Sequence, residues 1–156
     1  MTDRRCGDSG ITLVEMLIVL VLIGVSASVV TLSLPSAAPP RAVAQEAELL
    51  RSRLTLAAEY SLISARTLRL DWRSDGYSVE EWTGDAWQPT GTMDLTAMHR
   101  LEDGIVLGDG NGSRRGAVRI TPDLLPGSDG IATLRLSSGA NQRDLLFDGA
   151  TARLVP

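Results

Sequence analysis

The chain has 156 residues, of which 44% are hydrophobic and 22% are charged, and its net charge is −4. Its length is that of one ordinary domain, and this composition excludes a disordered chain, a collagen and a multi-span membrane protein. The acidic balance argues against a general nucleic-acid-binding protein, and a single Cys and a single His argue against a zinc site or a Cys/His catalytic pair.

A polar head is followed by nineteen residues without a charge, Met16 to Leu34. As a helix they would span about 28 Å, close to the ~30 Å core of a bilayer. Three interpretations compete. The segment could be a secretory signal peptide, with Arg4 and Arg5 as its basic region and a cleavage site at residues 25–27 or 36–38. It could also be a plain membrane anchor, or a span that later packs into a helical filament.

Glu15 helps to choose among them, because it lies one turn inside the apolar stretch that begins at Ile11. A carboxylate close to lipid costs free energy unless it reaches water or head groups, or binds a partner. A secretory signal peptide gains nothing from such a residue. The sequence therefore favours an interfacial glutamate or one kept for a partner.

Residues 10–15 read Gly-Ile-Thr-Leu-Val-Glu, between a short polar leader and the apolar run. This pattern resembles the prepilin signature of type IV pilins and of type II secretion pseudopilins. The resemblance implies cleavage after Gly10 by a prepilin peptidase, N-methylation of Ile11, and Glu15 as the fifth mature residue. Two features depart from the family pattern: Ile11 stands where Phe is most common, and Asp8 weakens the positive charge of the leader.

The implied mechanism is electrostatic. Cleavage would create an amine on Ile11, and this amine and the Glu15 carboxylate could attract each other by roughly 4 kcal/mol at ~4 Å. The amine could belong to the same chain or to a neighbouring subunit, and the family resemblance favours the neighbour. Small residues at Gly24 and 26–28 could allow close helix approach, or could simply be tolerated in a span.

The body is expected to begin after a Pro-rich kink or linker at residues 35–40, since prolines interrupt a straight helix. An amphipathic helix from about Ala42 to Ala65 follows, with one apolar face turned to a sheet. That predicted face comprises Val43, Ala47, Leu50, Leu54 and Ala57, widened by Leu49, Leu56, Tyr60 and Ile63.

Beyond Arg66 the hydrophobic period changes to two, which is typical of strands. Turn residues separate the runs, and Asp148-Gly149 is a hairpin signal. The predicted strands are 68–73, 77–82, a strand at Trp87, 105–107, 117–120, 132–136, 144–147 and 152–155. One helix followed by many short strands predicts an α+β fold with antiparallel sheets.

Residues 59–89 also resemble the minor pseudopilin H group of type II secretion, which includes FimT- and FimU-like minor pilins. The resemblance implies a pilin-like fold. We expect Trp82 and Trp87 to be structural, with two rings filling a core across a hairpin. The expected organisation is a leader at 1–10, a transmembrane and filament-core helix at 11–34, the kink and amphipathic helix at 35–66, and a periplasmic β-rich domain at 67–156.

Other candidate sites are weak. Residues 109–113 resemble the start of a calcium loop, but Arg114 and Ile120 stand where an EF-hand needs Gly and Glu. We expect a Gly-rich hairpin loop, and whether loop 108–116 binds a partner or calcium stays open. His99 is expected to be a surface histidine.

Two further candidates are Ser137-Ser138, which has no neighbouring base, and Arg114-Arg115, a small basic spot that could touch DNA phosphates. We expect no enzyme activity, no cofactor and no metal. The basic pair Arg4-Arg5 favours a cytoplasmic N-terminus, with the body across the membrane.

The resemblance thus implies a minor pseudopilin of the bacterial inner membrane, part of a periplasmic filament that helps export folded proteins. The implied partners are major and minor pseudopilins, the prepilin peptidase and the inner-membrane assembly platform; nucleic acid is not expected. One alternative is a minor type IV pilin in pilus assembly or DNA uptake. Another is a periplasmic binding module released by ordinary signal peptidase.

Overall fold

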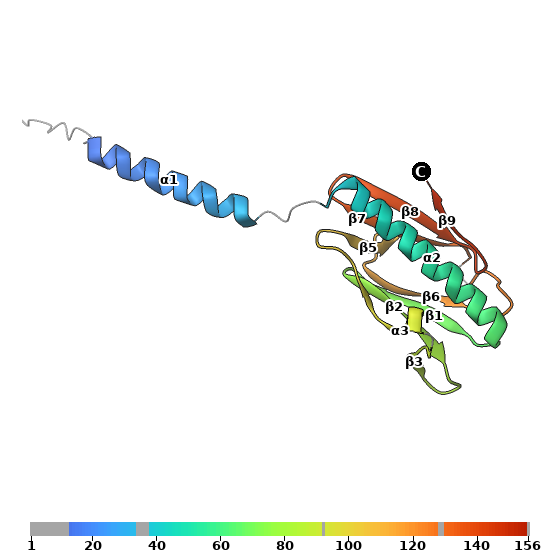
Figure 1. The fold of residues 1–156 in the computed structure, drawn as a ribbon. Coiled ribbons are helices and arrows are strands. Elements are labelled where there is room, and N and C mark those ends of the chain that lie inside the picture. The colour runs from blue at the N-terminus through green and yellow to red at the C-terminus, as the bar shows by residue number, and fades with distance from the viewer. Residues whose placement is uncertain (1–12, 34–37, 92, 128–129, 156) are drawn as a thin grey trace, which may run out of the picture. The chain divides into compact units, whose positions relative to one another are not determined.

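The computed structural model describes residues 13–33, 38–91, 93–127 and 130–155 (Figure 1). The chain divides into two compact units, residues 1–36 and 37–156. In the first unit the described element is α1, Leu13–Ser33. Within the described ranges, no helix reaches the combined length and hydropathy of a membrane span. The expected transmembrane role of 11–34 therefore stays a prediction.

The second unit begins with α2, Pro40–Ser64, close to the predicted range. Pro39 is extended, with φ −62° and ψ 151°, and Pro40 takes the first helical turn, where its missing N–H is not needed. The helix ends at Ala65, whose φ of 55° is left-handed. Residues 34–37, which include the first half of the predicted kink at 35–40, lie outside the described residues.

The predicted apolar face of α2 is confirmed at its centre. Its five central members are all at most 1% exposed: Val43, Ala47, Leu50, Leu54 and Ala57. Leu56 and Tyr60 pack partly buried against this core.

The predicted widening of that face is wrong at two positions, because Leu49 is 38% and Ile63 is 85% exposed. Ile63 lies two residues after the buried Ser61, and so about 200° around the helix, on the far side from the core.

The strands form two antiparallel sheets, as predicted. Sheet A has the order β3-β2-β1-β6, with β4 also on β2; sheet B has the order β5-β7-β8-β9. The bounds in sheet A are β1 Leu68–Arg73, β2 Gly76–Trp82, β3 Trp87–Pro89, β4 His99–Arg100 and β6 Arg115–Ile120. Those in sheet B are β5 Val106–Asp109, β7 Ala132–Ser138, β8 Asn141–Phe147 and β9 Ala152–Val155. The short helix α3, Met93–Thr96, and the strand β4 were not predicted.

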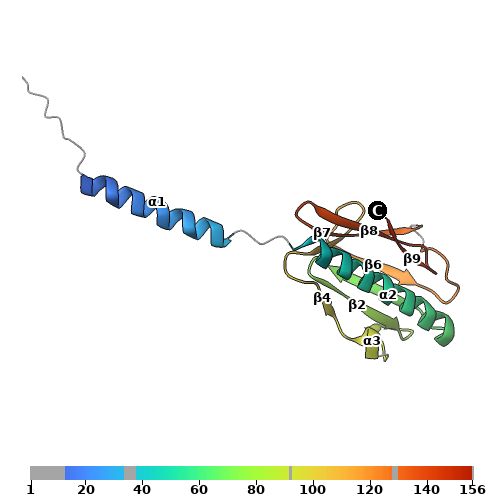
Figure 2. The same ribbon diagram turned by 45° about the horizontal axis from the view of Figure 1, so that its top comes forward.

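The core lies where α2 crosses the open side between the two sheets (Figures 1 and 2). Alternate residues of each central strand point inward, among them Leu70 from β1, Leu134 from β7 and Phe147 from β8. The result is one continuous apolar core under α2, which confirms the α+β architecture.

The two predicted hairpin tryptophans pair as expected but do not lie in the core. Trp82 faces Trp87 across β2 and β3, with ring centroids 5.2 Å apart. Trp82 is 39% exposed, because it shares a strand face with Glu80 rather than with the inward Val79. The tryptophan in the core is Trp72, which is 5% exposed.

Candidate assembly site

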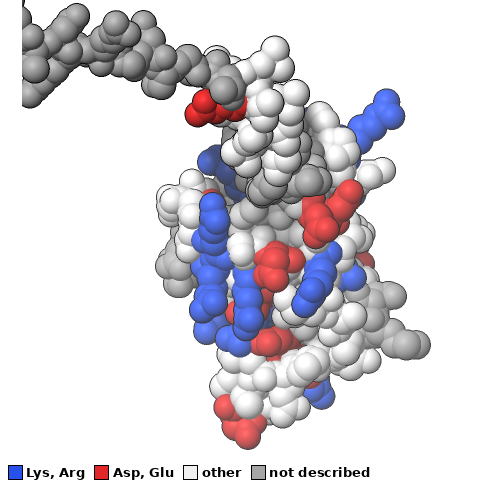
Figure 3. Space-filling model, turned by 90° about the vertical axis from the view of Figure 1, so that its left-hand side faces the viewer, with Lys and Arg blue, Asp and Glu red and all other residues white. Residues whose placement is uncertain are grey.

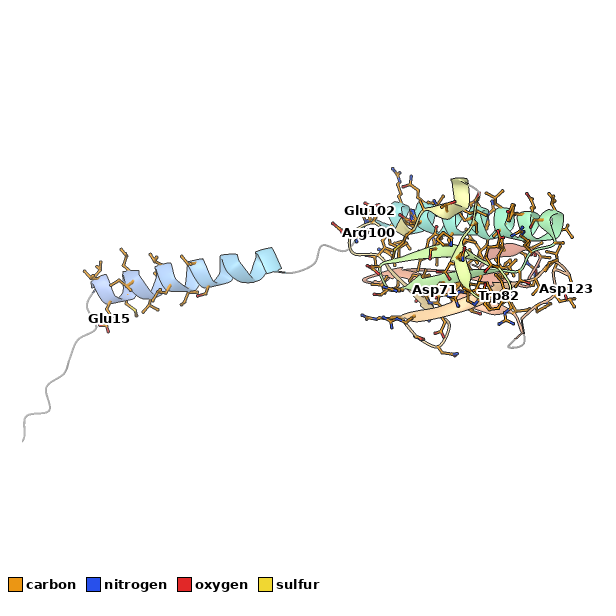
Figure 4. All side chains as sticks on the ribbon, turned by 90° about the horizontal axis from the view of Figure 1, so that it is seen from below. Glu15, Asp71, Trp82, Arg100, Glu102 and Asp123 are labelled. Atoms are coloured by element: carbon orange, nitrogen blue, oxygen red, sulfur yellow. The ribbon has the colours of Figure 1, made fainter. Side chains whose placement is uncertain are left out.

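Glu15 sits in the first turn of α1, near the start of the helix (Figure 4). The first turn carries the positive end of the helix dipole, which favours a carboxylate there. Gly10 and Ile11, the predicted cleavage and methylation positions, lie outside the described residues, so the distance from Glu15 to the Ile11 amine stays a prediction.

The surface of α1 around Glu15 is apolar on every side. Its large apolar side chains from Leu13 to Val25 are 44–82% exposed. Ser26, the next polar side chain, donates its hydroxyl to the Leu22 carbonyl at 2.7 Å, so it presents little polarity to a partner. A helix that is apolar all round needs lipid or other helices to cover it.

His99 is not the surface histidine that the sequence suggested. Its Nε2 lies 2.7 Å from Glu46 Oε2 on α2, and its ring lies 5.0 Å from that of Tyr77. The contact ties β4 to α2, and sequence spacing gave no sign of it because 53 residues separate the two partners. This is a structural contact between elements.

Tyr77 is fully buried beside this pair, and Arg53 lies 5.7 Å from its ring centroid. Burial raises the pKa of the Tyr77 phenol far above its usual value, and the charge of Arg53 opposes the rise only in part. The phenol therefore stays neutral across the physiological range and offers no catalytic base.

The calcium-loop candidate at 109–113 and the serine candidate at 137–138 both form hydrogen bonds within the chain. Asp109 Oδ1 accepts hydrogen bonds from the amides of Asn111 at 2.9 Å and Ser113 at 2.7 Å, a turn that leaves this oxygen little capacity for a cation. In the described parts of the chain, no three His, Cys, Asp or Glu residues come together as a metal site would require. Ser138 is buried, and its hydroxyl accepts the Ala38 amide at 2.7 Å, fixing the start of the body to β7.

Sequence reasoning missed the ion pair between Arg66 and Glu81, which closes the C-terminal end of α2 onto β2. Glu81 is only 7% exposed, and Tyr60 donates its hydroxyl to the same carboxylate at 3.5 Å. The period-two pattern of β2 carried a signal, since Glu81 falls on the inward face with Tyr77 and Val79.

The predicted basic spot is part of a wider mixed surface. Arg114 and Arg115 line a shallow hollow together with Arg73 and Asp75. Figure 3 shows one end of the body, where basic and acidic side chains stand beside one another. This arrangement is unlike a uniformly basic nucleic-acid surface.

Comparison with known proteins finds one similarity for the N-terminal segment, by sequence, and another for the body, by structure. Residues 5–31 match the family model of the prokaryotic N-terminal methylation motif. No curated protein sequence matches the chain. The match by sequence is thus confined to the segment around Glu15.

The body is similar to solved structures. The minor pseudopilin EpsH from the type 2 secretion system of Vibrio cholerae aligns with a TM-score of 0.60 at 16% identity, over 72% of this chain and 95% of that one. The type IV minor pilin FimU of Pseudomonas aeruginosa aligns with a TM-score of 0.56 at 13% identity, over 73% and 88%. At these identities the similarity shows the fold.

The motif implies anchoring to a membrane through the N-terminal segment, and the body has the fold of the minor pseudopilin and minor pilin structures. The chain joins a prepilin-type N-terminal methylation motif to the fold of minor pseudopilins and minor pilins, which confirms its resemblance to the pseudopilin H group.

Proposed function

We propose that this protein is a minor pseudopilin of a type II secretion system, cleaved after Gly10, methylated on Ile11 and assembled into a periplasmic pseudopilus through α1. The observation that carries the proposal is the methylation motif at residues 5–31, which covers most of a helix that is apolar on every side and has one carboxylate in its first turn. Such a helix needs a lipid or helical environment, and within it the carboxylate needs a cation.

In the proposed mechanism, the prepilin peptidase exposes the Ile11 amine and methylates it. The inserted subunit then leaves the inner membrane when its Glu15 binds the amine of a neighbouring subunit. Because water is scarce in both settings, the pair offsets the cost of burying either charge alone. Such pairing also sets the stagger between adjacent helices.

Mass spectrometry of the mature N-terminus tests the processing step. A methylated chain beginning at Ile11 is expected. A chain beginning near Ser28 or Pro39 would instead support a released periplasmic module, and the filament proposal would be abandoned.

Substitution Glu15→Ala tests the assembly step. We expect this variant to be cleaved normally but to be lost from filaments isolated with the cognate secretion system, and export to fall at least tenfold. Glu48→Ala, which removes an exposed carboxylate from α2, is the matched control and should assemble normally. Equal incorporation of Glu15→Ala and the parent would contradict the role of the carboxylate.

A minor type IV pilin is the second candidate, favoured by the similarity to FimU. The two functions differ in the phenotype of a deletion strain. Loss of export with intact pili supports the pseudopilin, whereas loss of pili or of DNA uptake supports the pilin. DNA binding by the protein that falls steeply with salt would also favour the pilin.

A further inference from the structure

A groove of about 540 Å³ runs along β6, the outermost strand of sheet A. Three consecutive residues of β6 line it: Ala117, Val118 and Arg119. Successive side chains of a strand point to opposite faces, and the groove also touches Arg69 and Trp87 on the outer face of sheet A, so it extends from that face to the backbone edge of β6.

The edge of β6 is open to pairing. Within the described residues, β6 pairs only with β1, in a register that runs from Leu68↔Ile120 to Arg73↔Arg115. Every second backbone N–H and C=O of an outermost strand points away from its sheet, so an added strand would find hydrogen-bonding groups there. At one end, the Ile120 carbonyl already accepts the Ser61 hydroxyl at 3.4 Å, which limits the free edge to the preceding residues.

The opposite wall of the groove is apolar and exposed. Leu125 and Ile131 both line it, and they are 59% and 55% exposed. Phe147 and Ala132 lie deeper in the same groove. A strand laid along β6 would cover these side chains with every second residue, which is how strand addition gains specificity beyond its backbone hydrogen bonds.

The charges around the groove favour an acidic occupant. Arg115 and Arg119 project from β6 on the same face as Arg73, and in the described parts of the chain none of the three has an ion-pair partner within 4.0 Å. Arg69 also lines the groove, where it binds Glu80 and stacks 4.6 Å over the Trp87 ring.

The nearest carboxylates offset this charge only in part. Asp123 lines the groove, but it accepts hydrogen bonds from the Thr121 hydroxyl and, at 3.3 Å, from the Leu125 amide. Asp71 lies on the same outer face of sheet A as Trp82 (Figure 4), opposite Ala117 and between Arg115 and Arg119, so it offsets part of their charge. β6 itself carries two arginines and no carboxylate, on a chain whose net charge is −4.

The same charges argue against a second copy of this chain as the occupant. Antiparallel pairing of two β6 edges about a twofold axis through Ala117, the middle of the pair of arginines, would bring Arg115 of one strand opposite Arg119 of the other, and like charges directly opposite each other destabilise a sheet. An acidic strand from a different protein meets no such repulsion.

We propose that the free edge of β6 binds an extended acidic segment of another protein, which adds as a further strand to sheet A and buries Leu125 and Ile131. This site lies in the body and does not depend on α1, on Glu15 or on the proposed role in secretion. The binding proposal can therefore be tested, and can hold or fail, whatever the outcome of the Glu15→Ala assembly experiment.

The probe is a capped eight-residue peptide of alternating Val and Glu, added to the full-length protein in mild detergent. We expect binding that weakens as salt is raised, with slower amide hydrogen exchange in β6. Arg119→Glu should reduce affinity at least tenfold. Arg143→Glu, a charge reversal at an exposed position of β8, is the matched control and should bind like the parent.

Three further probes decide the mode of binding. A peptide with Pro at its centre cannot pair as a strand and should not bind, and a Val-Lys peptide should not bind. Leu125→Ser, at an exposed position, should weaken binding without altering the fold, which covers the case in which Arg119→Glu is poorly folded.

The proposal is overturned if no peptide binds, if the Pro or Lys peptide binds as well as the Glu peptide, or if exchange in β6 is unchanged on binding. It is also overturned if the edge instead supports self-association of this chain, or if a single-stranded oligonucleotide displaces the Glu peptide and protects β6 better than it does.

Discussion

Gly116 shows how one residue of β6 admits the largest side chain of the core. It lies directly opposite Trp72 on the neighbouring strand, and a Cβ at this position would sit 2.4 Å from Cζ2 of the indole. The Trp72 ring therefore lies in the space that a side chain at position 116 would fill, so the packing of this ring requires glycine there.

We expect Gly116→Ala to lower the free energy of unfolding by about 1–3 kcal/mol, because the rigid indole must move from a filled core. Urea unfolding followed by tryptophan fluorescence measures the change. Gly91→Ala is the control, since a Cβ there meets no atom within 4 Å. Equal stability of the two variants would contradict this role.

Tyr77 carries a buried hydroxyl that has no hydrogen-bond partner among the described residues. Because burial raises its pKa above the ordinary value of about 10, folding favours the neutral phenol. Its contribution to stability is present below pH ~10 and is lost as the pH rises toward the folded-state pKa.

We therefore expect Tyr77→Phe to be as stable as the parent at pH 7, or more stable by about 1 kcal/mol, and to lose less stability above pH 10. The chain has no Lys, so few other groups titrate in this range. Thermal unfolding by circular dichroism between pH 7 and 11 measures the effect. Tyr60→Phe, at a half-buried position, should keep the alkaline loss of the parent; an equal flattening in both variants would contradict the assignment.

At the scale of elements, α2 was predictable because its periodicity reports one buried face. The edges of that face could not be predicted, because apolar residues such as Ile63 also occur on the solvent-exposed side of the helix. The strands with clear alternation were likewise found. β4 was missed because two residues carry no period, and it exists because Gly76 lets the chain approach closely: a Cβ there would lie 2.4 Å from the His99 carbonyl oxygen.

Leu54 and Ile63, the first fully buried and the second largely exposed, test whether the buried face of α2 carries its contribution to stability. Leu54→Ala should lower the free energy of unfolding by about 2–5 kcal/mol, since Leu54 is a core residue that is 0% exposed. Ile63→Ala should change stability by less than about 0.5 kcal/mol, since Ile63 is 85% exposed. Denaturant unfolding of both variants measures the difference. A large loss in Ile63→Ala would mean that a partner or another part of the chain covers this side of α2.

At the scale of the whole molecule, the two units have separate roles. The buried core residues that the structure describes run from Ala38 to Ala152 and belong to the second unit. The body is therefore expected to hold its fold without the helix that we propose for assembly.

A chain that begins at Ala37 should fold, with a melting temperature within a few degrees of the full-length protein in detergent, and should stay monomeric. Circular dichroism and analytical ultracentrifugation measure these properties. The control is a chain that begins at Ala42, which lacks the Ala38 amide bound to Ser138 and the Pro40 helix start, and should melt lower. A body that unfolds without α1 would show that the first unit contributes to its core.

The features that could be predicted before the fold was known depend on residues close together along the chain. The prepilin-type motif, the apolar run, the main face of α2 and the alternating strands are local patterns, read from spacing along the chain. Contacts between residues far apart in the chain, such as His99 with Glu46 and Arg66 with Glu81, became visible in the folded structure. The surface position of Trp82 and the open edge of β6 were also visible only there. The hydrophobic period of a segment predicts which of its side chains turn inward. The strand that lies at the edge of a sheet depends on how the whole chain packs around its core, and no local pattern carries that information.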